Sequence, residues 1–127
     1  MEFKLTVLAT LAALAVYLWT ISNVGVARGK YKVLAPATDG PAEFVRALRV
    51  QLNTLEQLPL LLAPLWMCAW LLGDRWAAAG GLLWCAGRVV YALAYYRDPS
   101  KRALGYLISI GACLLLMGGT LVALVTH

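Results

Sequence analysis

The stretch Arg46–Pro64 (RALRVQLNTLEQLPLLLAP) decides how the chain is organised. It is polar for its first dozen residues, and from there the chain is apolar through Leu72. As an α-helix, with about 100° between successive residues, it gathers its polar side chains within an arc of about 100°. Ionisable groups at the edge of a membrane span are costly unless they are paired or functional. The stretch therefore predicts a membrane helix whose polar face forms a site: Arg46, Arg49, Asn53, Glu56 and Gln57.

The composition indicates an integral membrane protein. Of the 127 residues, 62% are hydrophobic and 13% are charged, whereas a soluble domain has nearly half apolar residues and about a quarter charged. This length has room for a single domain, residues 1–127. The net charge of +5 does not indicate nucleic-acid binding, because the basic residues flank apolar spans.

Four apolar segments predict an all-α, four-helix membrane bundle, with spans at about residues 5–27, 42–72, 76–96 and 103–125. Small residues allow membrane helices to approach closely, so Gly111, Gly118 and Gly119 are expected to be packing positions in the last span. An even number of spans places both termini on one side. Basic residues concentrate in the first and third loops, which the positive-inside rule assigns to the cytoplasm: Arg28, Lys30, Lys32, Arg97, Lys101 and Arg102.

Two polar clusters meet at this cytoplasmic end. The third span presents Trp84, Arg88, Tyr91 and Tyr95 on one face, at the same depth as the polar face of the second span. Arginine forks bind carboxylates, while tyrosines and amides supply neutral hydrogen bonds. A peptide with two carboxylates, one amine and a thiol would fit, and a nearby arginine lowers a thiol pKa from its usual value of about 8.5.

Structural alternatives remain open for these residues. The arginines can be interfacial anchors, and the tyrosines can belong to an aromatic belt. Glu56 can form an internal ion pair with Arg49 or Arg88. Gln51 lies about 160° from the centre of the polar face, so it is either a surface residue or part of a neighbouring subunit's site.

No metal site is predicted. Cys68, Cys85 and Cys113 lie inside apolar runs without the spacing of metal ligands, so they are expected to be buried small hydrophobes. The single histidine is His127, the last residue.

The motifs resemble those of the MAPEG family, the membrane-associated proteins in eicosanoid and glutathione metabolism. The resemblance runs from Asp39–Phe44 (DGPAEF) through Arg49–Pro59 (RVQLNTLEQLP) and Gly87–Tyr95 (GRVVYALAY) to Arg102. The pattern is closest to the branch of leukotriene-C synthase and the microsomal glutathione transferases. Two positions depart from that synthase: Gln57 replaces a tyrosine, and Gly29 replaces an arginine.

The resemblance implies a homotrimer that binds glutathione at its subunit interfaces. One subunit would supply Arg49, Asn53, Glu56, Tyr91, Tyr95 and Arg102, and its neighbour would supply Arg28 and Gln51. Arg102 matches the arginine that stabilises the thiolate. Arg49 and Arg28 would hold carboxylates, Glu56 the amino group, and Tyr91 and Tyr95 would orient the peptide.

The expected activity is that of a glutathione transferase, in which the thiolate attacks a lipophilic electrophile, or of a peroxidase that reduces a lipid hydroperoxide. The expected location is a bacterial inner membrane. A non-catalytic lipid-binding member of the same family is one alternative. A protein whose polar face only joins subunits is another.

Overall fold

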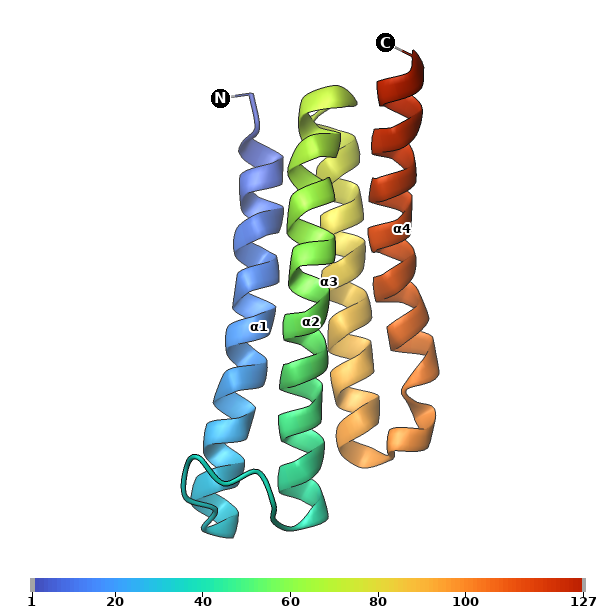
Figure 1. Ribbon diagram of the computed structural model, residues 1–127. Helices are drawn as coiled ribbons and strands as arrows, with labels where there is room; N and C mark the ends of the chain where they lie inside the picture. Colours follow the sequence, from blue (N-terminus) through green and yellow to red (C-terminus); the bar gives the residue numbers. More distant parts are fainter. Residues whose placement is uncertain (1, 127) are drawn as a thin grey trace.

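The computed structural model describes residues 2–126 and contains four long antiparallel α-helices (Figure 1). Short connections join consecutive helices, and no strand occurs in the described part. Both ends of the chain lie at the same end of the bundle. The elements are α1 (Lys4–Tyr31), α2 (Ala42–Leu71), α3 (Asp74–Arg97), the short 3-10 helix η1 (Pro99–Lys101) and α4 (Ala103–Thr126).

All four α-helices are long and apolar enough to cross a membrane. Many large apolar side chains point outward, among them Trp70, which is 83% exposed. Such a surface suits lipid rather than water, and the architecture fits a multi-pass membrane protein. Two details differ from the sequence expectation: α1 continues to Tyr31, and η1 was not expected at all.

A hydrophobic core joins the four helices along the half of the bundle that contains the termini. Leu61 and Leu65 of α2, Trp84 of α3 and Leu116 of α4 are buried together there. At the same end, the Asp74 carboxylate accepts hydrogen bonds from the first-turn amides of α1. These amides have no partner within their own helix, so Asp74 ties the start of α1 to the start of α3.

The opposite, basic end contains the longer connection, residues 32–41. The Arg28 guanidinium lies 5.0 Å from the centre of the Phe44 ring and donates a 2.8 Å hydrogen bond to the carbonyl of Ala37. Gly40 packs closely against Val33 and Phe44, where a Cβ atom would be crowded. The connection is thereby fastened to the ends of α1 and α2.

Two glycines bring α3 and α4 into close contact near the basic end. A Cβ atom at Gly87 would lie 2.7 Å from the backbone nitrogen of Ser109, and one at Gly105 would collide with the backbone of Tyr91. A Cβ atom at Gly119 would also be tight, 3.1 Å from Leu72, whereas one at Gly111 or Gly118 would meet no other atom within 4 Å. The expectation that Gly111 and Gly118 are packing positions is therefore wrong within the protomer, because the close approach occurs nearer the basic end.

Replacing Gly105 by alanine should destabilise the bundle. The added methyl group would force α3 and α4 apart at Tyr91, and such overpacking costs about 1–3 kcal/mol. Thermal unfolding of the detergent-solubilised protein measures the effect. Gly118→Ala on the same helix is the matched control and should unfold at or above the wild-type temperature. Equal stability of the two variants would contradict the close contact.

Candidate functional site: a polar cavity at the basic end

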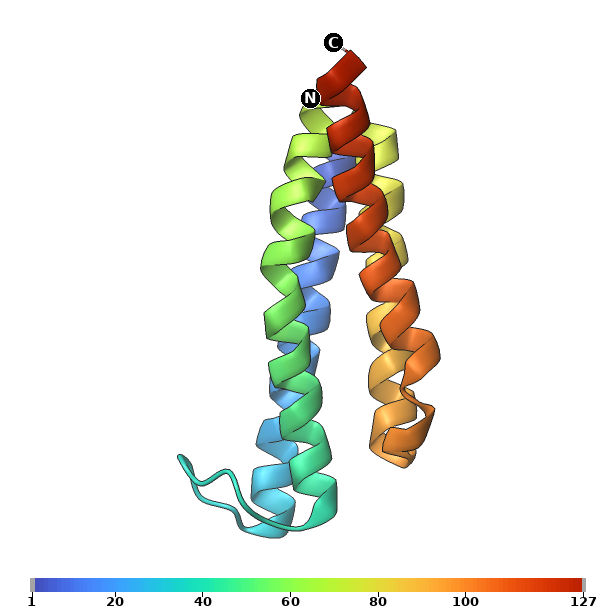
Figure 2. The same cartoon turned by 45° about the vertical axis from the view of Figure 1, so that its right-hand side comes forward.

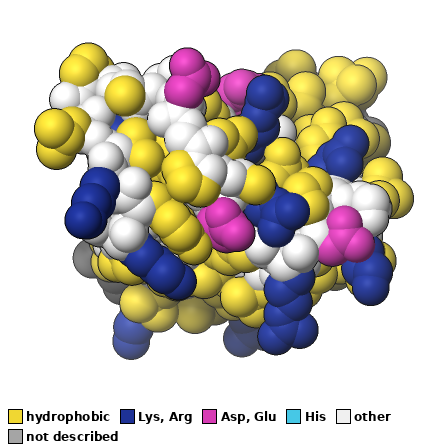
Figure 3. Space-filling view, turned by 90° about the horizontal axis from the view of Figure 1, so that it is seen from below, with side chains coloured by type: hydrophobic (Ala, Val, Ile, Leu, Met, Phe, Trp, Pro, Cys, Tyr) yellow, Lys and Arg dark blue, Asp and Glu magenta, His cyan; other side chains and the backbone are white. Residues whose placement is uncertain are grey.

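A polar cavity of about 850 Å³ opens at the basic end of the bundle. Its walls come from the 32–41 connection, α2, α3 and the residue before α4. A second cavity of about 410 Å³ adjoins it and shares Asn53, Tyr91 and Arg102 with it. Viewed along the bundle onto this end, lysine and arginine side chains surround a surface that also carries several carboxylates (Figure 3).

The large cavity brings together most of the residues that the sequence predicted for the site. They come from α2, from α3 and from the residue before α4, which are far apart in the chain. These residues are Arg49, Asn53, Glu56, Tyr91, Tyr95 and Arg102. The predicted polar faces of the second and third spans therefore line one cavity within a single protomer.

Arg28 and Gln51 do not line either of these cavities. Arg28 instead contacts the connection that follows it, through the carbonyls of Ala37 and Val33. Gln51 is half-buried on another face of α2, as its helical position predicted. Neither residue is brought to the cavity of its own protomer.

Two members of the predicted polar face have structural contacts instead. The Arg46 guanidinium is 3.4 Å from the carbonyl oxygens of Tyr96 and Arg97, where it supplies donors to the C-terminus of α3. Gln57 is only 4% exposed, and its side-chain oxygen accepts a 3.0 Å hydrogen bond from the indole nitrogen of Trp84. The position of Arg46 and Gln57 on the polar face of α2 is therefore not enough to predict whether they line the cavity.

The charged groups of the cavity are unpaired. Within residues 2–126, no salt bridge within 4.0 Å joins Arg49, Glu56 or Arg102 to an opposite charge. The alternative of an internal ion pair between Glu56 and Arg49 or Arg88 is therefore not realised. Both side chains, Arg49 and Glu56, are exposed, so their charges remain available to a ligand.

Arg88 lies directly behind the cavity and is completely buried. Its guanidinium donates to Asn53 Oδ1 at 2.9 Å, to Thr54 Oγ1 at 3.0 Å and to Ser109 Oγ at 3.2 Å. The centre of the Tyr91 ring is 4.1 Å from its Cζ atom, within the range of a cation–π contact. The sequence placed Arg88 beside Tyr91 but did not reveal these partners.

The short helix η1 positions Arg102. The Asp98 carboxylate accepts hydrogen bonds from the hydroxyl and the amide of Ser100, at 2.8 and 3.1 Å. These bonds hold the pKa of Asp98 below its usual value, so the carboxylate is charged at neutral pH. Arg102 donates a 2.8 Å hydrogen bond to the carbonyl of Pro99. That bond leaves the other guanidinium N–H groups free for a ligand.

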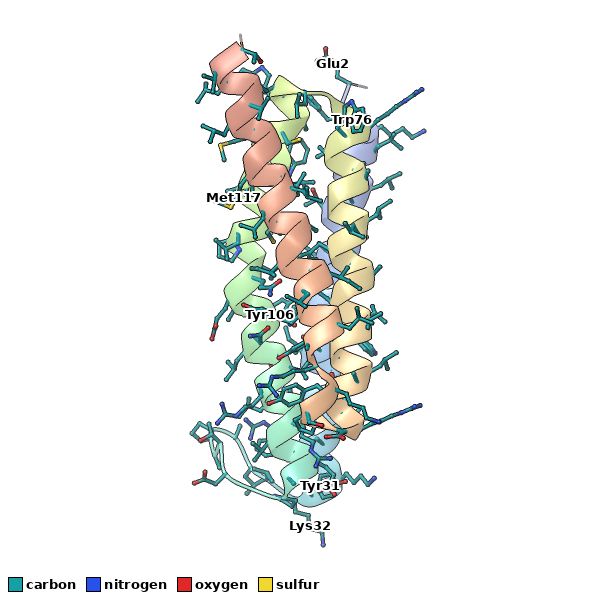
Figure 4. The ribbon with its side chains drawn as sticks, turned by 90° about the vertical axis from the view of Figure 1, so that its right-hand side faces the viewer. Glu2, Tyr31, Lys32, Trp76, Tyr106 and Met117 are labelled. Atoms are coloured by element: carbon teal, nitrogen blue, oxygen red, sulfur yellow. The ribbon has the colours of Figure 1, made fainter. Side chains whose placement is uncertain are left out.

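Four polar residues that line the cavities were not predicted as site residues. Thr38 and Asp39 line the large cavity, while Ser100 and Tyr106 line the small one. Tyr106 lies in the lower half of the bundle, above the turn between α3 and α4 (Figure 4). The Asp-Gly-Pro sequence at 39–41 signals a turn, but no local pattern shows that the turn folds over α2.

The cysteines are buried and free, as expected for small core residues. Cys68, Cys85 and Cys113 all lie on apolar helical faces away from the large cavity. His127 lies outside the described residues. The polar groups that line the two cavities are guanidinium, carboxylate, amide, phenol and aliphatic hydroxyl groups.

Known proteins are similar to this chain over most of its length. The family model "MAPEG family" matches residues 6–122. An uncharacterized protein of Synechocystis sp. is 42% identical over 117 residues, which cover 92% of this chain and 85% of that protein. Microsomal glutathione S-transferase 2 of Mus musculus is 41% identical over 94 residues, or 74% of this chain.

The alignment with the mouse transferase spans 64% of that protein, less than two thirds of its length. Leukotriene C4 synthase of Cavia porcellus is 33% identical over 129 residues, which cover all of this chain and 86% of the synthase. The family match covers nearly the whole bundle, including every residue of the two cavities. The chain belongs to the MAPEG family.

Proposed function

We propose that this protein is a membrane-bound glutathione transferase that activates the thiol of glutathione for attack on a lipophilic substrate. The observation that carries the proposal is the convergence of six predicted residues, from separate parts of the chain, on one cavity of about 850 Å³. The similarity to microsomal glutathione S-transferase 2 and leukotriene C4 synthase supports the choice of thiol.

The unpaired charges match the groups of glutathione. Arg49 binds a carboxylate of the peptide, since a guanidinium fork accommodates both oxygens of that group. Glu56 binds the amino group. Tyr91 and Tyr95, whose ring centres are 5.5 Å apart, orient the peptide between α2 and α3.

Arg102 stabilises the thiolate. It lies where the two cavities meet, so a sulfur atom beside it would face the space for a second substrate. A guanidinium favours the deprotonated thiol electrostatically and lowers its pKa. The lipophilic substrate reaches the site from the bilayer. The thiolate then forms a C–S bond with an electrophilic carbon, and the displaced group leaves or takes up a proton. With a lipid hydroperoxide, the thiolate takes the terminal oxygen, the O–O bond breaks to release an alcohol, and a second glutathione converts the resulting sulfenic acid to the disulfide and water.

The complete site is formed in a homotrimer. Arg28 and Gln51, which do not line the cavity of their own protomer, contribute to the site of the neighbouring subunit. The basic loops lie on the cytoplasmic side of a bacterial inner membrane, in agreement with the charge asymmetry of the loops.

Replacing Arg102 by alanine should remove thiol activation while largely preserving glutathione binding. Loss of a group that stabilises the developing anion typically costs about 100-fold or more in turnover. We would measure thiolate absorbance in the ultraviolet on addition of glutathione to the detergent-solubilised protein, together with turnover and the glutathione Kd. The wild type should give a thiolate signal that Arg102→Ala lacks.

Lys101→Ala is the matched control, because Lys101 is an exposed cation beside Arg102 that lines neither cavity. It should retain the thiolate signal. If the wild type gives no signal and glutathione does not raise its unfolding temperature, the transferase proposal fails. A lipid-binding or purely structural member of the family would then be the better description.

Coexpression of two inactive variants should test the shared site. Mixed trimers of Gln51→Glu and Arg102→Ala subunits contain some sites with both native residues, because the two positions come from different subunits. Turnover should therefore rise above that of either variant alone.

The control pair is Arg49→Ala with Arg102→Ala, whose positions line the same cavity of one protomer. Every site in these mixtures lacks one of the two arginines, so turnover should stay low. Recovery in both mixtures, or in neither, would contradict the division of the site between subunits.

A further inference from the structure

The buried guanidinium of Arg88 determines which atom of Asn53 faces the cavity. An arginine only donates hydrogen bonds, so the Asn53 atom 2.9 Å from Arg88 Nη2 must be the amide oxygen. The opposite orientation would place two donors against each other behind the cavity. The amide nitrogen of Asn53 is therefore the atom left for the cavity, which Asn53 lines.

The neighbours of Arg88 make this orientation obligatory. The Thr54 hydroxyl donates to the carbonyl of Val50 at 2.8 Å, and the Ser109 hydroxyl donates to the carbonyl of Tyr106 at 3.0 Å. Each hydroxyl has thus used its only proton and presents lone pairs to Arg88. Nη2 divides its two protons between Thr54 and Asn53, so no alternative partner can replace the Asn53 oxygen.

Burial makes the orientation expensive to change. Arg88 is 0% exposed, and its Nε already lacks a partner within the described residues. A buried donor that loses its acceptor costs more than the hydrogen bond contributes, and the cost is larger for a charged group. Rotating the Asn53 amide would therefore be strongly unfavourable.

We infer that Arg88 is a positioning residue that holds Asn53 as a hydrogen-bond donor toward an anionic or carbonyl group of the bound peptide. The inference rests on the proposed function for the identity of that peptide. Arg88 also leaves a positive charge 4.1 Å behind the Tyr91 ring, with no salt bridge within residues 2–126. Both effects favour acceptor groups of the ligand at this wall.

The decisive variant is Asn53→Asp, which has nearly the same shape but presents only oxygens. Its carboxylate would pair with Arg88, so the unfolding temperature should equal or exceed that of the wild type. Glutathione binding should nevertheless weaken by about tenfold or more, because the donor is replaced by an acceptor. Asn53→Ala should weaken binding as well but also lower the unfolding temperature.

A double-mutant cycle tests whether Arg88 acts through Asn53. Arg88→Met should weaken glutathione binding in the wild type but should have little further effect in Asn53→Ala. If Arg88→Met does not fold, Arg88→Lys takes its place, since one ammonium cannot serve Asn53, Thr54 and Ser109 together. Additive losses would overturn the inference.

Calorimetric titration with glutathione and thermal unfolding without ligand provide the two measurements. Undiminished binding by Asn53→Asp would overturn the donor role. A stabilised Asn53→Asp in a protein that does not bind glutathione at all would refute the proposed function while supporting the contact between Arg88 and Asn53. A destabilised Asn53→Asp would refute the contact.

Discussion

A guanidinium that is completely removed from solvent ties three helices together at the level of the cavity. Arg88 of α3 donates hydrogen bonds to side chains of α2 and α4, and it has no solvent with which to replace them. A charge buried in a membrane protein must be satisfied internally. If α2, α3 or α4 rotated or slid here, this charge would lose its hydrogen-bond acceptors. The same contacts therefore hold the cavity wall in place.

This constraint depends on the small residues around it. Gly87 precedes Arg88 and lies against the backbone at Ser109, while Gly105 lies against the backbone of Tyr91. The hydroxyl of Ser109 is short, so it can reach Arg88 only if α3 and α4 are in close contact. Nearer the termini, the large apolar core joins all four helices, whereas toward the basic end the ribbons of α3 and α4 diverge from those of α1 and α2 (Figure 2). The polar cavity lies at this basic end, beyond the residues of the large apolar core.

The four helices could be predicted because the length of each apolar segment, and the charges that flank it, can be read directly from the local sequence. Helical periodicity also placed Asn53, Glu56, Tyr91 and Tyr95 on the faces of α2 and α3 that line the cavity. Periodicity could not distinguish Gln57 from its neighbours, because its burial depends on Trp84 of another helix. Asp39 was missed for a similar reason: its place in the cavity depends on how the connection folds back.

Arg88 and Arg102 are identical side chains in opposite environments. Three acceptors on α2 and α4 surround Arg88, so its charge is fixed in place and both of its Nη atoms are engaged. Arg102 is exposed on a turn and has a single recorded acceptor, the carbonyl of Pro99. Of the two arginines, only Arg102 lines both cavities, which suits the proposed contact with a reacting sulfur. Arg88 is buried, with its Nη atoms bonded to α2 and α4, which suits the proposed positioning of Asn53.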